Sequence, residues 1–349
     1  MSPAGRASWS RRIDALRKEG KLQEALELAR HAYGDSPQSS SVKRSYGWAI
    51  YSRIKEHVDG YFNTLSDKSP EAQSRRESAH NQLNFLLREY AEAELPRRDL
   101  CLSLILSQAT RLRAPPRSLP KVLKWVRVEG LRDEDCSANE GSSGRLYPSL
   151  LEKVTDRLAT VAIQSEAPKA SELALEWLEV TRARAAPLIE PERLTAHRGP
   201  LLRLSGRLDE AVLYARNQLS HNKHDASAWR EWSLCERERE PSLSLWLGVR
   251  AALEARANLS RQELTVWAEY LAVVAREAGE EQSALSLGLW SMAQREDMGA
   301  PRHDDTLYLT RSLGGSEALE LPLDASLNSL NQRAKRLSDL ALTTKQSDT

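Results

Sequence analysis

Residues 20–37 read GKLQEALELARHAYGDSP, and the prediction of the fold begins with this stretch. Gly20 precedes the apolar pattern and Pro37 follows it, and both residue types favour the ends of helices. Between them, small and apolar residues recur at steps of three and four, which is the spacing of one face of an α-helix. These residues are Leu22, Ala25, Leu26, Ala29 and Ala32. The stretch therefore predicts a helix that is bounded on both sides.

A second helical face lies just upstream of this stretch, and it is expected to end at residues 18–19. Its apolar residues, which share the helical spacing, are Trp9, Ile13 and Leu16. A turn at Gly20 then joins the two predicted helices as an antiparallel pair. Because Ala25 and Ala32 are small, they allow the two helices to approach each other closely.

This predicted pair resembles the tetratricopeptide repeat, a unit of two antiparallel helices about 34 residues long. Ile13 departs from the pattern, because the repeat has a small residue at that place in its first helix. The resemblance implies that successive pairs stack into a right-handed α-solenoid. The residues that stand at the characteristic places of the repeat are Trp9, Gly20, Leu22, Ala25, Ala32 and Pro37.

Further copies of the pattern follow along the chain. Residues 206–219 read GRLDEAVLYARNQL, and Gly199 supplies the small residue of the helix before them. Trp229, one repeat length after Thr195, opens the first helix of the next unit, and residues 243–253 form its second helix. A looser unit covers residues 264–292. The matching residues of these copies are Gly206, Leu208, Ala211 and Ala215, followed by Trp267, Ala272, Gly279, Ala284 and Leu285.

Composition favours the all-α class throughout the 349 residues. The chain is rich in Leu, Ala, Glu and Arg, which are strong helix formers, and it has only two Phe and few β-branched runs. Hydrophobic residues make up 40% of the chain, which is too many for a disordered protein. The predicted fold is an all-α, right-handed solenoid of tetratricopeptide-like pairs, with irregular longer helices in the middle.

The middle of the chain is less regular than its ends. The first helix of a second repeat is expected over residues 41–57, and longer helices over 80–90, 100–112 and 150–164. Breaks are expected at Pro96 and at residues 114–120. Four segments are predicted: repeats over 1–130, an acidic polar loop over 131–147, repeats over 148–313, and a C-terminal helix (327–340) with a frayed tail over 314–349.

The central stretch also resembles tetratricopeptide-like proteins encoded beside bacterial conflict and defence genes. The residues that carry this resemblance are Trp125, the acidic residues 133–135, and Tyr147, Pro148, Ser149 and Leu150, which open a helix. The resemblance covers about a tenth of the chain, and it implies a bacterial protein with a role in antiviral defence.

No sequence motif predicts an active site or a cofactor. Walker A, GxGxxG, GxSxG and HExxH patterns are absent. His221 and His224 stand three residues apart and His303 lies beside two aspartates, but metal sites need three or four converging ligands. We therefore expect no enzyme, no cofactor and no metal.

The cysteines and the apolar runs predict a cytoplasmic protein that does not enter a membrane. Cys101, Cys136 and Cys235 are far apart in the sequence, which argues against a disulfide framework. No apolar run follows the basic N-terminus, and the longest one, residues 100–106, is far too short to span a bilayer.

A basic stretch over residues 97–127 is one candidate binding surface, since it carries a single acid, Asp99. Such a cluster can follow a phosphate backbone while Trp125 stacks on a base. Alternatively, these residues cap helix ends or pair with the acidic loop. The net charge of +1 gives little steering toward a polyanion. The candidate nucleic-acid-binding residues are Arg97, Arg98, Arg111, Arg113, Arg117, Lys121, Lys124 and Arg127.

The second candidate surface is the concave groove that the first helices of successive repeats line in such solenoids. Trp, Tyr and Arg are the residues that most often anchor interfaces. In the alternative interpretation, Trp48 and Tyr51 belong to the core between repeats. The residues expected in the groove are Arg44, Trp48, Tyr51 and Lys55, together with Arg230 and Arg237 in a later repeat.

These observations favour a non-catalytic scaffold or adaptor that binds a protein partner in its groove. The carboxylate clamp of chaperone-tail-binding repeats is missing, because its places hold Ser10, Asp14, Arg44, Trp48, Ala196 and Pro200. The alternative is a nucleic-acid-binding accessory protein that uses residues 97–127. The two hypotheses differ in the salt dependence of nucleic-acid affinity.

Overall fold

The computed structural model describes residues 3–140, 143–185, 187–255, 259–301 and 303–313. Over these residues the regular structure is helical, apart from one short hairpin. The predicted all-α class is therefore confirmed. Two compact units, Met1–Ser205 and Gly206–Thr349, divide the chain and are described separately.

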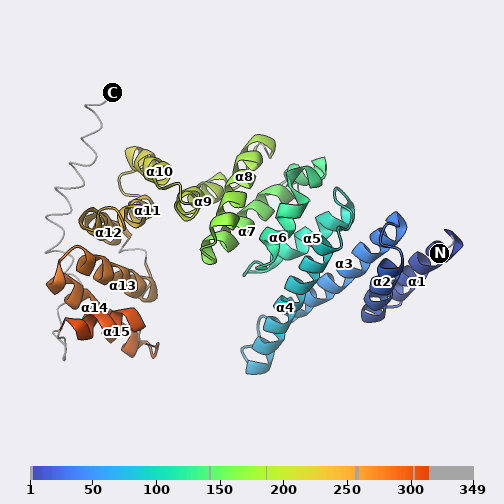
Figure 1. Cartoon of the computed structure of the whole chain (residues 1–349), viewed down its shortest axis with the longest axis horizontal. Helices are drawn as coiled ribbons and strands as arrows, with labels where there is room; N and C mark the ends of the chain where they lie inside the picture. The colour runs from blue at the N-terminus through green and yellow to red at the C-terminus, as the bar shows by residue number, and fades with distance from the viewer. Residues whose placement is uncertain (1–2, 141–142, 186, 256–258, 302, 314–349) are drawn as a thin grey trace. The chain divides into compact units, whose positions relative to one another are not determined.

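The first unit contains nine α-helices among its described residues (Figure 1). They are α1 (Pro3–Lys18), α2 (Leu22–Asp35), α3 (Ser40–Asn63), α4 (Pro70–Glu92), α5 (Leu100–Arg111), α6 (Leu119–Val126), α7 (Leu150–Gln164), α8 (Pro168–Arg184) and α9 (Pro191–Leu204). Between α6 and α7 lie the 3-10 helices η1 (Val128–Gly130) and η2 (Asp133–Cys136), then the antiparallel hairpin of β1 (Asn139–Glu140) and β2 (Leu146–Tyr147).

Helix α2 packs against both α1 and α3, and α1 also packs against α3. The face of α2 that makes these contacts is the one predicted from the sequence. Ala25, Ala29 and Ala32 are fully buried, and Leu26 is almost so. Gly20 has a φ of +77° in the turn between α1 and α2, a backbone conformation that suits glycine.

The boundaries of α7 agree with the predicted ones, whereas the start of α4 does not. Ser149 begins α7 with a capping box, in which its hydroxyl accepts from the Glu152 amide and Glu152 accepts from the Ser149 amide. Helix α7 then covers the predicted range of 150–164. Helix α4 begins earlier than predicted, because the Ser69 side chain caps it and Pro70 follows at the first position.

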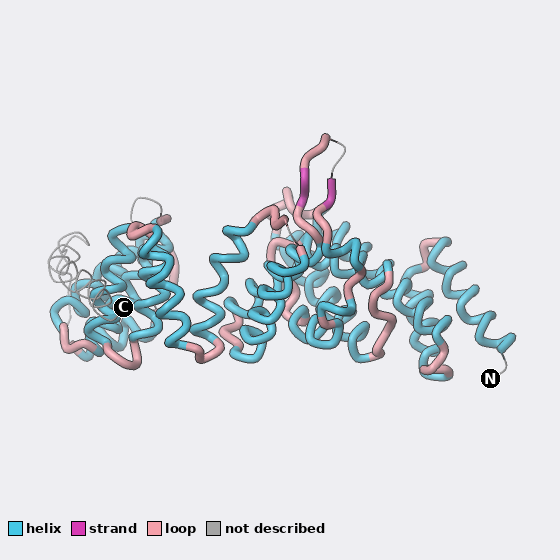
Figure 2. Tube along the Cα trace, turned by 90° about the horizontal axis from the view of Figure 1, so that it is seen from above, coloured by secondary structure: helices cyan, strands magenta, loops and turns pink. Residues whose placement is uncertain are grey.

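The acidic loop over 131–147 lies inside the first unit and does not separate the chain there. Helix α7, which follows the loop, packs against α5, α6 and η2, so the helices on both sides of the loop share one core. Figure 2 shows the β1–β2 hairpin extending beyond the neighbouring helices of this unit. The predicted division at residues 131–147 therefore differs from the division at Ser205.

The second unit contains α10 (Leu208–His221), α11 (Ala226–Glu236), α12 (Pro241–Ala255), α13 (Arg261–Glu277), α14 (Glu281–Asp297) and α15 (Asp304–Ser312). Helices α11 to α14 pack each against the next. Trp229 and Trp232 stack at a ring separation of 5.9 Å and are buried, as is Trp267. The predicted helices 243–253 and 264–292 correspond to α12 and to α13 with α14.

Two predictions concern the C-terminal residues and the boundary between the two units. The predicted helix at 327–340 and the tail over 314–349 lie outside the described residues. The second copy of the repeat pattern crosses the boundary between the units, because Gly199 lies in α9 and Gly206 begins the second unit. No helix in the described part of the chain is long and apolar enough to cross a bilayer.

Replacing Ala25 or Ala211 with Leu should destabilise the chain by about 1–3 kcal/mol, because each fully buried methyl group leaves no room for a larger side chain. Denaturant unfolding followed by circular dichroism measures the effect. The control is Ala196→Leu, since Ala196 is exposed on α9. Equal stability of all three variants would show that these alanines do not lie at tight helix contacts.

Candidate functional site

A cleft of about 370 Å³ lies between α1 and α3. Helix α1 contributes Asp14, Arg17 and Lys18, and α3 contributes Arg44, Ser45 and Trp48. The cleft therefore gathers three cationic side chains and one carboxylate beside an aromatic ring. Two of the sequence-predicted groove residues, Arg44 and Trp48, lie in it.

Arg17 is the fixed cation of this cleft. Its Nη1 donates to Asp14 Oδ1 at 3.0 Å, and its Nε donates to Ser52 Oγ at 3.0 Å. The guanidinium also lies over the ring of Trp48, 5.3 Å from the ring centre. Because Ser52 in turn donates to the Trp48 carbonyl, these contacts connect α1 to one turn of α3.

Lys18 and Arg44 are the unpaired cations of the cleft. Both side chains are exposed, and neither makes a hydrogen bond or ion pair with any described residue. Asp14 is already engaged by Arg17, so it cannot neutralise them fully. The cleft consequently carries an excess of positive charge, which favours an anionic ligand.

Trp48 is half-buried. It is therefore neither fully exposed, as a groove residue would be, nor fully buried, as a core residue would be. Its ring meets Tyr51 edge-on at a centroid distance of 5.6 Å. The core face of α3 is formed by other residues, among them Tyr46, Ala49 and Ile50, which are buried. Lys55 is exposed further along α3 and does not line the cleft.

A partly buried cluster of polar side chains connects α3 to α2 and α4. Arg30 of α2 binds Glu89 of α4 through two contacts, at 2.5 and 2.8 Å, and the Tyr46 hydroxyl of α3 donates to the same carboxylate. Burial and the neighbouring Glu89 raise the pKa of Tyr46, so the hydroxyl stays protonated. Because three helices meet at one carboxylate, the cluster fixes the wall of the cleft that α3 forms.

The basic stretch over 97–127 does not present a single array of free cations. Arg97 donates to the Trp125 carbonyl at 3.0 Å and lies over its ring, and Arg98 pairs with Asp133. Lys121 pairs with Glu92 at 2.5 Å, and Arg111 lies 3.5 Å from Asp59. The remaining members have exposed side chains that make no hydrogen bond or ion pair with described residues. They are Arg113, Arg117, Lys124 and Arg127.

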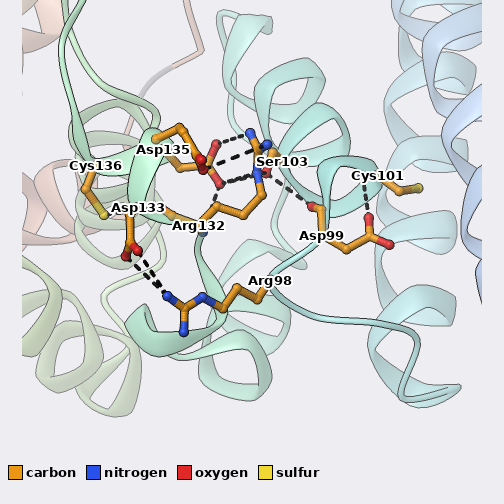
Figure 3. A network of polar contacts seen from close by, with 9 residues as sticks. Arg98, Asp99, Cys101, Ser103, Arg132, Asp133, Asp135 and Cys136 are labelled. Atoms are coloured by element: carbon orange, nitrogen blue, oxygen red, sulfur yellow. Dashed lines mark hydrogen bonds and ion pairs between the residues drawn. The ribbon is translucent and has the colours of Figure 1, made fainter.

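The acidic loop accounts for part of this pairing, as Figure 3 shows. Asp135 is buried and accepts from Ser103 at 2.6 Å and from Arg132 at 2.9 Å. Asp133 accepts from Arg98 at 3.1 Å and from Arg184 at 3.5 Å. The loop is therefore attached to α5 and α8 by hydrogen bonds and ion pairs, and its charges stabilise the fold.

Two candidates from the second unit, Arg230 and Arg237, have internal partners. Arg237 binds Glu277 through two contacts, at 2.7 and 3.0 Å. The Arg230 guanidinium lies over Trp267, 4.9 Å from the ring centre, and lines an apolar pocket of about 290 Å³ between α11 and α13.

The histidines and cysteines singled out in the sequence do not gather into a site. His224 pairs with Glu254 at 2.9 Å, and His221 contacts the Asn217 carbonyl at 2.7 Å. No group of three or more His, Cys, Asp or Glu side chains within the described ranges is arranged to hold a metal ion. The three cysteines are free and buried, and burial raises the pKa of Cys101, which makes its thiol a poor nucleophile.

Sequence reasoning missed Arg17 and Lys18 as cleft residues. They stand in the last turn of α1, where basic residues are common because they complement the helix dipole. The sequence did carry a signal for them. Arg17 and Lys18 lie one helical turn after Ile13 and Asp14, on a helix that was already expected to line the groove.

No protein-family model matches this chain, and no curated protein matches it either. The function is therefore inferred from the side chains of the α1–α3 cleft and from their contacts.

Replacing Trp48 with Ala should lower stability by about 1–2 kcal/mol, because a half-buried ring gains only part of the transfer free energy of a buried one. The matched variant is Trp232→Ala, which should cost about 3–5 kcal/mol, since that indole is fully buried. Thermal and denaturant unfolding measure both. A loss for Trp48→Ala as large as that for Trp232→Ala would assign Trp48 to the core.

Proposed function

We propose that this chain is a right-handed helical-repeat scaffold of tetratricopeptide type that binds a protein partner without catalysing a reaction. The repeat pattern of residues 9–37 supports the repeat type, together with the packing of α2 between α1 and α3. In solenoids of this kind, the first helices of successive pairs line the binding face. Helices α1 and α3 occupy those places in the sequence pattern.

The observation that carries the proposal is the pair of unpaired cations, Lys18 and Arg44, beside the half-exposed indole of Trp48 in one cleft. A Trp and an Arg together form a typical interface anchor. The excess positive charge favours an acidic segment and accelerates its association. We therefore propose that the partner presents a segment of acidic residues with one apolar side chain that packs on Trp48.

Nucleic-acid binding through residues 97–127 is the second candidate. It is supported by the four exposed cations without internal partners, Arg113, Arg117, Lys124 and Arg127. The affinity for single-stranded RNA, measured as salt is raised, separates the candidates. Each neutralised phosphate contributes a slope of about −0.7 in log K against log salt for a single strand, whereas a scaffold without phosphate contacts shows no such affinity.

The proposed cleft is tested with fluorescein-labelled peptides of acidic, neutral and basic composition, each carrying one Leu or Trp. Fluorescence anisotropy should show the tightest binding for the acidic peptides. The double variant Arg44→Glu with Trp48→Ala should weaken that binding about tenfold or more, because a hydrogen bond to a charged group contributes about 1.5–3 kcal/mol.

The matched control is Arg75→Glu, since Arg75 is exposed on α4 outside the cleft. It changes the net charge of the chain by the same amount as Arg44→Glu. Equal losses in the control and in the double variant would show a nonspecific charge effect. Unchanged acidic-peptide binding in the double variant would remove the cleft from the proposal.

A further inference from the structure

A second pocket in the first unit, about 320 Å³ in volume, lies where α5, α7 and α9 meet. This volume is at the lower end of the range of small-molecule sites, about 300–1,000 Å³. Its charged lining consists of four basic and three acidic side chains: Arg111, Lys153, Arg157 and Arg193, and Glu152, Asp156 and Glu190.

The three carboxylates of this pocket are all satisfied from within the protein. Glu152 is buried and accepts from the backbone amides of Ser149 and Ile189, at 2.9 and 2.8 Å. Asp156 accepts from Arg193 at 2.8 Å and lies 3.0 Å from a ring nitrogen of His197. Glu190 accepts from the same Arg193 at 3.0 Å.

The charge state of Asp156 follows from these contacts. Burial alone would raise the pKa of this carboxyl group, but the hydrogen bond with His197 and the positive charges of Arg193 and Arg157 lower it below its usual value. Asp156 is therefore ionised at neutral pH, and Arg193 is committed to it and to Glu190. Neither Asp156 nor Arg193 is then available to a ligand.

The other three cations of the pocket keep spare donors. Arg157 uses its Nε to donate to the Thr110 carbonyl at 3.2 Å, and its two Nη groups make no hydrogen bond or ion pair with described residues. Lys153, one helical turn earlier on α7, makes no hydrogen bond or ion pair in the described part of the chain. Arg111 lies over the ring of Phe62, 4.8 Å from its centre, and makes an exposed contact with Asp59 and a bond to Gln108.

One neutral donor adds to this set. The hydroxyl of Ser107 makes no side-chain hydrogen bond with described residues, and it lines the same pocket from α5. Donors from α5 and α7 thus converge on one cavity whose charged lining, four basic and three acidic side chains, carries a net charge of +1. The spare donors of Arg157, Lys153 and Ser107 fit an anion with several acceptor oxygens on one centre, which is the chemistry of a phosphoryl group.

We propose that the α5–α7–α9 pocket binds a phosphoryl group carried by a small molecule. Arg157 and Lys153 contact its oxygens from α7, and Arg111 and Ser107 contact them from α5. This pocket is distinct from the α1–α3 cleft and shares no lining residue with it.

The test is isothermal titration calorimetry of the full chain with pyrophosphate and with ADP. Both should bind, and binding should raise the melting temperature. Tighter binding of ADP would identify a nucleotide as the source of the phosphoryl group, and equal affinity would identify the free anion. Lys153→Gln should weaken binding about tenfold or more, and so should Arg157→Gln.

The control is Lys169→Gln, since Lys169 is exposed on α8 and lies outside the pocket. Arg157→Gln also removes the bond to the Thr110 carbonyl, so its fold is checked by circular dichroism, whereas Lys153 has no internal contact to lose. Failure of both ligands to bind would overturn the proposal. Equal weakening by Lys169→Gln would also overturn it, as would binding of a 5′-phosphorylated RNA without binding of either small molecule.

Discussion

The contact of α2 with α1 and α3 is the constraint on which the cleft depends. Ala25, Ala29 and Ala32 are fully buried, and side chains of this size let three helices meet along one seam. This packing places Arg17 and Lys18 of α1 and Arg44 and Trp48 of α3 in the lining of the same cleft. Larger side chains on this face of α2 would separate α1 from α3 and break the contact between Arg17 and Ser52.

Two kinds of interaction, apolar contacts and polar hydrogen bonds, determine how the helices pack in this part of the molecule. Small apolar contacts set the spacing of the helices, and they act without direction. The polar cluster of Arg30, Tyr46 and Glu89 sets their rotation and register, because its hydrogen bonds have defined geometry. The cluster is only partly buried, because the Arg30 side chain is 37% exposed, and its carboxylate meets both of its partners.

The sequence predicted what depends on local periodicity, and little of what depends on long-range pairing. The buried face of α2 and the start of α7 at Ser149 follow from spacing and capping residues. Pairing of the basic stretch with the acidic loop was one of the alternatives, and Arg98 does pair with Asp133. The partners of Asp135 on α5 and of Asp133 on α8 could not be predicted, because they lie far away in the sequence. The same holds for the α5–α7–α9 pocket, because its lining residues come from separate helices and its spare donors can be recognised only in the folded chain.

We propose above that an acidic partner segment contacts the indole of Trp48 in the α1–α3 cleft. The most direct measurement is the ¹⁵N–¹H resonance of that indole, assigned with Trp48→Phe, as an acidic peptide is added. We expect the chemical shift of the Trp48 indole N–H to change as peptide is added, whereas that of the fully buried Trp232 stays the same. A Trp48 resonance that stays in place while the peptide binds would contradict it.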